Sequence, residues 1–129
     1  MAMRIDHAAL YVRDLEGIRA FYERYFGARA GAKYQNPRTG LSTYFLSFDG
    51  EGRLEIMQRP GLAPRTERQL AEGYVHLAFS LGSREAVDAL TGRLRADGYE
   101  VLSGPRTTGD GYYESCVLDP EGNPIELVA

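Results

Sequence analysis

The 129-residue chain carries one pattern of secondary-structure signals twice, and this repeat limits the possible folds more than any other feature. In the first half, residues 4–12 are rich in apolar and β-branched side chains and predict a strand. Asp14 then offers a helix N-cap, apolar residues follow at helical spacing, and Gly27 is a helix stop. Three more strands are expected at Ala30–Tyr34, Thr43–Phe48 and Arg53–Gln58. The first half is therefore expected to fold as β-α-β-β-β.

The second half repeats this order of elements. A strand is expected at Tyr74–Leu81, and a helix follows between the cap candidate Ser83 and the stop Gly98. The last three strands are expected at Glu100–Ser103, Tyr113–Leu118 and Pro124–Val128. We therefore predict an α+β fold of two tandem βαβββ modules within a single domain, 1–129. Module one spans 1–59, a linker spans 60–73, and module two spans 74–129.

Neither module can bury its apolar surface alone. Each places a helix on one face of a four-stranded sheet and leaves the other face to be covered. Two such sheets facing each other would bury those faces and leave the helices outside. The space between the sheets would then form a natural pocket. We therefore expect facing sheets around a cleft.

The chain contains only two histidines, and each is expected in the middle of the first strand of its half, at His7 and His76. The last strand of each half carries a glutamate between two aliphatic residues, at Glu55 and Glu126. The histidines are separated by nearly as many residues as the glutamates. The four residues are therefore two copies of one pair.

Strand geometry indicates where these side chains point. Because successive side chains alternate between faces, both glutamates face away from the helix when their aliphatic neighbours pack beneath it. The same alternation turns both histidines toward the cleft. A buried carboxylate is costly without a partner, whereas two carboxylates and two imidazoles are all satisfied around a divalent cation. We therefore predict one metal held by His7, Glu55, His76 and Glu126.

The mixed nitrogen and oxygen donors favour Zn²⁺, Ni²⁺, Co²⁺, Mn²⁺ or Fe²⁺ over Ca²⁺ or Mg²⁺. The alternative is that the sheets do not face each other and that all four residues are ordinary surface residues. That alternative does not explain why a histidine and a glutamate occupy equivalent positions in both halves.

Composition excludes several classes of partner. The net charge is only −3 and the basic residues are scattered, so no polybasic stripe is present to bind nucleic acid. No apolar stretch approaches the roughly 20 residues that span a bilayer, so no membrane partner is expected. Cys116 is the single cysteine and cannot form an intrachain disulfide, which favours a cytoplasmic location. We expect Cys116 to be a small core residue rather than a nucleophile.

The chain resembles a known family over essentially its whole length, and two stretches carry most of that resemblance. The first is His7 with the following Val-Arg-Asp-Leu and Phe-Tyr, and the second is the closing segment Leu118–Leu127. With the duplicated βαβββ pattern, they resemble the vicinal-oxygen-chelate superfamily. This superfamily contains glyoxalase I, extradiol dioxygenases, methylmalonyl-CoA epimerase, and bleomycin- and fosfomycin-resistance proteins. The order His, Glu, His, Glu is similar to bacterial-type glyoxalase I.

The resemblance implies a lactoylglutathione-lyase-like metalloenzyme. In that family the metal binds two oxygens of a hemithioacetal and stabilises a cis-enediolate while a glutamate moves a proton between neighbouring carbons. Glu126 matches the proton-transferring base, and Glu55 matches the opposing ligand, which can act on the other face of the substrate. The chain departs from the family at two positions. Tyr11 stands where an arginine usually contacts glutathione, and Arg59 stands where an asparagine is usual.

These departures leave open whether glutathione, another thiol or no thiol is used. The expected function is a glyoxalase-like lyase or isomerase acting on a small substrate with vicinal oxygens. One alternative is an Fe²⁺ extradiol-type dioxygenase that uses His7, His76 and Glu126. Another is a non-catalytic protein that binds a drug or metabolite in the cleft. We expect a homodimer, and the site lies either within one chain or across two chains.

Overall fold

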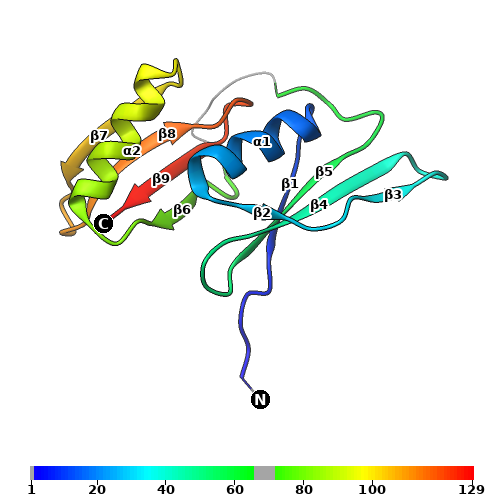
Figure 1. The fold of residues 1–129 in the computed structure, drawn as a ribbon, viewed down its shortest axis with the longest axis horizontal. Helices are drawn as coiled ribbons and strands as arrows, with labels where there is room; N and C mark the ends of the chain where they lie inside the picture. Colours follow the sequence, from blue (N-terminus) through cyan, green and yellow to red (C-terminus); the bar gives the residue numbers. More distant parts are fainter. Residues whose placement is uncertain (1, 66–71) are drawn as a thin grey trace. The chain divides into compact units, whose positions relative to one another are not determined.

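The computed structural model describes residues 2–65 and 72–129, and each of these two ranges forms one compact unit (Figure 1). The first unit contains β1 (Ala8–Tyr11), α1 (Leu15–Phe26), β2 (Arg29–Ala30), β3 (Tyr34–Asn36), β4 (Leu41–Ser47) and β5 (Arg53–Gln58). The second unit contains β6 (Leu77–Ser80), α2 (Arg84–Ala96), β7 (Val101–Thr107), β8 (Tyr113–Leu118) and β9 (Pro124–Val128). The α+β class and the repeated module are confirmed. The predicted linker 60–73 lies partly outside the described residues.

The two sheets share one topology. The first has the order β1-β5-β4-β2, with β3 also paired to β4, and the second has the order β6-β9-β8-β7. In each sheet the first and last strands of the unit are parallel neighbours, and the remaining pairs are antiparallel. The strand that carries each glutamate therefore lies directly beside the strand that follows each histidine. The facing of the two sheets around a cleft stays a prediction.

The helix signals are confirmed in both units. The Asp14 side chain caps α1 by accepting a hydrogen bond of 3.0 Å from the Gly17 N–H. Gly27 ends α1 in the left-handed conformation at φ 65°, which glycine adopts without a steric penalty. Ser83 caps α2 in the same way, accepting from the Ala86 N–H at 3.1 Å. The predicted stop at Gly98 follows the C-cap residue of α2.

The helices cover one face of each sheet and create its core. The buried apolar residues of the first unit include Ile18, Phe21, Tyr22, Leu46, Leu54 and Ile56. Those of the second unit include Val87, Leu94, Val117, Ile125 and Leu127. In both glutamate-bearing strands the aliphatic neighbours are thus buried, and the predicted alternation of the two glutamates away from the helix is confirmed.

The first strand predicted in each half is shorter in the structure, β4 is shifted toward the N-terminus, and the second strand predicted in each half differs in its pairing or its extent. The strand expected at Ala30–Tyr34 is divided into β2 and β3, because the five residues from Ala30 to Tyr34 lie opposite only four residues of β4, from Leu46 to Thr43. This extra residue shifts the pairing register, as a β-bulge does. The strand expected at Glu100–Ser103 extends as β7 to Thr107, with irregular pairing to β8 that accommodates the Gly-Pro dipeptide.

The prediction that the histidines lie in the middle of their strands is wrong. His7 and His76 come directly before β1 and β6, whose pairing starts at Ala8 and Leu77. The reason is where the partner strands begin, since β5 starts at Arg53 and β9 starts at Pro124, the residues level with the two histidines. The residues that precede each histidine therefore extend beyond the partner strand.

A buried turn sets the position of β9. The Asp119 side chain is 3% exposed and accepts hydrogen bonds from the backbone N–H groups of Glu121 and Asn123, both at 2.9 Å. A third hydrogen bond comes from the Asn123 side-chain amide at 2.8 Å. These contacts join β8 to β9 tightly and fix the register in which Cys116 opposes Glu126. Within the part of the chain that the structure describes, no helix has the length and apolar character to cross a membrane.

The buried hydroxyl pair of Thr91 and Ser115 generates a stability prediction. The Thr91 hydroxyl donates to the Val87 carbonyl at 2.6 Å and lies 2.7 Å from the Ser115 hydroxyl, which therefore donates to it. Thr91→Val keeps the shape but leaves the Ser115 hydroxyl without this acceptor. We expect the free energy of unfolding to fall by about 1–3 kcal/mol in a urea titration. Thr107→Val, at an exposed position, should change it by less than about 0.5 kcal/mol, and equal effects would contradict the prediction.

Candidate functional site

The first histidine–glutamate pair lies on the face of the first sheet that α1 does not cover. Glu55 is directly opposite Ala9 in the parallel pairing of β5 with β1, and His7 lies two residues before Ala9 on the same face. The His7 Nε2 atom is 3.5 Å from the Glu55 Oε1 atom. The His7 side chain is 34% exposed and that of Glu55 is 16% exposed, so both are reachable but partly sheltered.

The second pair repeats this arrangement. Glu126 is directly opposite Ala78 in the parallel pairing of β9 with β6, and His76 lies two residues before Ala78. The His76 Nε2 atom is 3.1 Å from the Glu126 Oε1 atom. The structure therefore brings the four predicted site residues together as two pairs, each within its own unit.

The spacing within each pair fits two donors to one ion. Nitrogen and oxygen ligands about 2.1 Å from a shared metal are separated by roughly 3.0–3.4 Å at angles between square and tetrahedral. The observed separations of 3.5 Å and 3.1 Å are close to this range. In the residues that the structure describes, no group of three or more His, Cys, Asp or Glu side chains gathers as a metal site. Each pair by itself thus supplies two donors.

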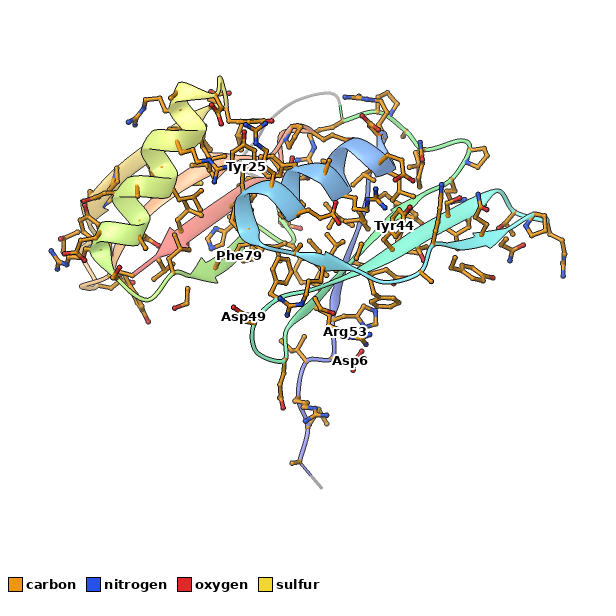
Figure 2. The ribbon with its side chains drawn as sticks, in the orientation of Figure 1. Asp6, Tyr25, Tyr44, Asp49, Arg53 and Phe79 are labelled. Atoms are coloured by element: carbon orange, nitrogen blue, oxygen red, sulfur yellow. The ribbon has the colours of Figure 1, made fainter. Side chains whose placement is uncertain are left out.

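A carboxylate and a guanidinium that the sequence pattern did not predict lie near His7. The Asp6 Oδ2 atom lies 2.7 Å from the His7 Nδ1 atom. It also lies 2.7 Å from the Arg53 Nη2 atom, and Asp6 and Arg53 are close together in Figure 2. The hydrogen bond with His7, followed by that with Arg53, holds the pKa of Asp6 below its usual value. The sequence signal was the spacing of Arg53 two residues before Glu55, which places both on one face of β5.

An aromatic ring completes this cluster. Phe45 opposes Glu55 in the antiparallel pairing of β4 with β5. The Arg53 guanidinium carbon lies 4.5 Å from the Phe45 ring centroid, and the His7 ring meets Phe45 edge-on at 5.1 Å. Phe45 therefore contacts both the cation and the imidazole of the cluster.

The surroundings of Glu126 are acidic. Cys116 opposes Glu126 on β8, and Glu114 lies two residues from Cys116 on the same face. Burial raises the pKa of Glu114, and the charge of Glu126 together with a hydrogen bond between the two carboxyl groups raises it further. Cys116 was expected in the core, but it is only partly buried on this face, because Ser115 and Val117 occupy the buried positions beneath α2.

Comparisons with known proteins agree with this architecture. The family model described as "Glyoxalase/Bleomycin resistance protein/Dioxygenase superfamily" matches residues 4–127. The "Uncharacterized protein YqjT" of Bacillus subtilis is 37% identical over 130 residues, which cover 97% of this chain and 98% of that protein.

More distant similarity reaches a named enzyme and a solved structure. Lactoylglutathione lyase of Salmonella typhimurium is 28% identical over 128 residues, covering 98% of this chain and 92% of that enzyme. The crystal structure of the glyoxalase family protein from Enterococcus faecalis has a TM-score of 0.80 at 26% identity. It covers 98% of this chain and 97% of that one.

The acidic surroundings of Cys116 predict its reactivity. Burial raises the pKa of the Cys116 thiol, and the charges of Glu126 and Glu114 raise it further, because all three favour the neutral thiol. In EDTA-treated protein, the pH profile of iodoacetamide alkylation should have its midpoint above about 8.5, the ordinary thiol pKa. Glu126→Gln removes one negative charge and should move the midpoint down.

The matched control is Glu85→Gln, in the first turn of α2, on the side of the sheet away from Glu126. It should leave the midpoint unchanged when alkylation is followed by mass spectrometry. A midpoint at or below about 8.5, or one that Glu126→Gln does not move, would contradict this placement of Cys116.

Proposed function

The chain belongs to the Glyoxalase/Bleomycin resistance protein/Dioxygenase superfamily, and from that premise we propose that it is a divalent-metal-dependent lyase or isomerase. Its substrate is a small molecule with two adjacent oxygen atoms. The observation that carries the proposal is the pair of His–Glu contacts at 3.5 Å and 3.1 Å, each at the spacing of two donors to one ion.

The metal ligands of this proposal are His7, Glu55, His76 and Glu126. Their nitrogen and oxygen donors suit Zn²⁺, Ni²⁺, Co²⁺, Mn²⁺ or Fe²⁺. When bound, such an ion supplies Lewis-acid chemistry, because it polarises adjacent substrate oxygens and stabilises the negative charge that develops as a proton leaves the neighbouring carbon. Since each pair supplies two donors, a four-ligand site requires both pairs.

The proton-transfer role falls to the carboxylates. Glu126 accepts the proton from one substrate carbon and returns it to the next, and Glu55 is the opposing carboxylate that can act on the other face. Similarity to lactoylglutathione lyase across nearly the whole chain supports this class of chemistry. Tyr11, which is 55% exposed, lies on the same strand face as His7 and replaces the arginine expected there. The proposal therefore does not specify whether the substrate contains glutathione, another thiol or no thiol.

Three further features belong to the proposal. The two units act as one domain joined by the linker 60–73, and the chain functions as a homodimer. The cytoplasmic location, for which the single cysteine Cys116 is the argument, also remains part of it. A site within one chain and a site shared across two chains both predict the same number of ions per chain.

Metal content tests the ligand set. Wild-type protein loaded with Ni²⁺ or Zn²⁺ and desalted should retain about one ion per chain by elemental analysis. His76→Ala and Glu126→Ala each remove one of the four donors and should lower the affinity enough that stoichiometric metal is not retained after desalting. The exposed control Glu85→Gln should retain the ion. Retention of stoichiometric metal by both site variants would contradict the ligand set.

Proton exchange tests the reaction class. The metal-loaded protein is incubated in D₂O with α-hydroxycarbonyl compounds and with hemithioacetals of glutathione and other thiols, and the substrate C–H signal is followed by NMR. We expect exchange or turnover with at least one compound. Glu126→Gln should lower the rate per bound ion by about 10²–10⁴-fold, since the base is lost. Glu51→Gln, whose side chain is 88% exposed, should not lower it.

The same samples separate the rival functions. No exchange on any compound by metal-replete protein would count against the proposal. Oxygen uptake with a catechol after anaerobic Fe²⁺ loading would indicate the ring-cleaving dioxygenase instead. Tight binding of a ligand without turnover would indicate a sequestering protein.

A further inference from the structure

The Asp6 carboxylate restricts where His7 carries its proton. An ionised carboxylate can only accept hydrogen bonds, so the 2.7 Å contact requires a hydrogen on His7 Nδ1. A neutral imidazole carries one ring N–H, and Nε2 is then left with a lone pair. That lone pair lies on the atom that is 3.5 Å from Glu55 Oε1, which is itself an acceptor. These two atoms are both hydrogen-bond acceptors, and a cation that binds between them satisfies both.

Arg53 holds Asp6 in this position. Asp6 lies in the segment before β1, beyond the end of the partner strand β5. The Arg53 guanidinium reaches Asp6 from β5 with a contact of 2.7 Å, and the two side chains lie close together in Figure 2. The same guanidinium lies over the Phe45 ring of β4. Arg53 therefore links Asp6 to the two strands that also carry Glu55 and the ring beside His7.

Among the described residues, the second module does not repeat this cluster at the equivalent positions. The residue before His76 is Val75, which is 67% exposed, where the first module has Asp6. Pro124 stands two residues before Glu126, where the first module has Arg53. Neither replacement can accept a hydrogen bond from an imidazole through a side-chain oxygen or donate one from a guanidinium. The two modules therefore differ at the positions around the His7 imidazole.

We propose that Asp6, held by Arg53, is a positioning residue that fixes His7 in its Nδ1–H tautomer and directs the Nε2 lone pair toward the ion shared with Glu55. This inference rests on the proposed metal site and deepens it, because it makes the two histidine ligands inequivalent. Carboxylates that accept from the second nitrogen of a ligating histidine fix its orientation and raise its basicity. His7 is thus pre-oriented by its own module, whereas His76 has no such carboxylate before it in the chain.

The tautomer is measured first, in metal-free protein. Long-range ¹H–¹⁵N NMR of ¹⁵N-labelled protein at about pH 9 distinguishes the two ring nitrogens of each histidine and shows which of them carries the hydrogen. In the wild type, His7 is expected in the Nδ1–H form. Asp6→Ala should remove that preference, Asp6→Glu should restore part of it, and Arg53→Gln should weaken it. The control Asp49→Ala, at a fully exposed carboxylate, should leave it unchanged.

Metal affinity is measured second, by competition of Zn²⁺ against a chromophoric chelator. Asp6→Ala should weaken Zn²⁺ binding by about 10–100-fold, and Asp49→Ala should not. Both variants lie at exposed positions, so the circular dichroism spectrum and the urea midpoint should match those of the wild type.

The outcomes separate this inference from the proposed function. Absence of Zn²⁺ binding by the wild type would overturn the metal site itself. His7 in the Nε2–H form in the wild type, or an unchanged tautomer in Asp6→Ala, would overturn only the role of Asp6. A changed tautomer with unchanged Zn²⁺ affinity would also overturn it, because the positioning would then have no effect on the ion.

Discussion

The parallel pairing of the first and last strands in each unit is the constraint on which the site depends. It places the strand after each histidine beside the strand that carries each glutamate, so Ala9 faces Glu55 and Ala78 faces Glu126. Burial of the aliphatic residues on either side then sets the direction of each carboxylate. Turning Glu126 toward α2 would require Ile125 and Leu127, both 0% exposed, to leave the core. Fully burying each of these side chains contributes roughly 1.5–3 kcal/mol, so the hydrophobic core fixes the polar face.

The sequence predicted what depends on local signals and on periodicity. The caps at Asp14 and Ser83, the glycine stop at Gly27 and the alternation around both glutamates follow from side-chain chemistry over a few residues. The strands β5, β8 and β9 were predicted with their observed bounds, because turn residues delimit each of them. The pairing of equivalent histidines and glutamates followed from the repeat alone.

What the sequence did not predict depends on pairing between distant strands. The β2–β3 division arises from an extra residue opposite β4, and register against another strand is not readable from either strand alone. The position of each histidine before its strand is set by where β5 and β9 begin. Asp6 and Arg53 are far apart in the sequence. Only the parallel register of β1 with β5 brings the Arg53 guanidinium within 2.7 Å of the Asp6 carboxylate.

The surroundings of the two pairs differ in charge, and this difference matches a division of labour in the proposed reaction. A guanidinium, a carboxylate and an aromatic ring surround His7, which suits the fixed orientation of a ligand. A second carboxyl group, Glu114, lies beside Glu126, and its raised pKa favours the form that holds a proton. A glutamate that exchanges protons gains from a neighbouring carboxyl group, because a hydrogen bond between them accommodates the proton on either one. Under the proposed function, the metal-orienting role belongs to the first module and the proton-moving role to the second.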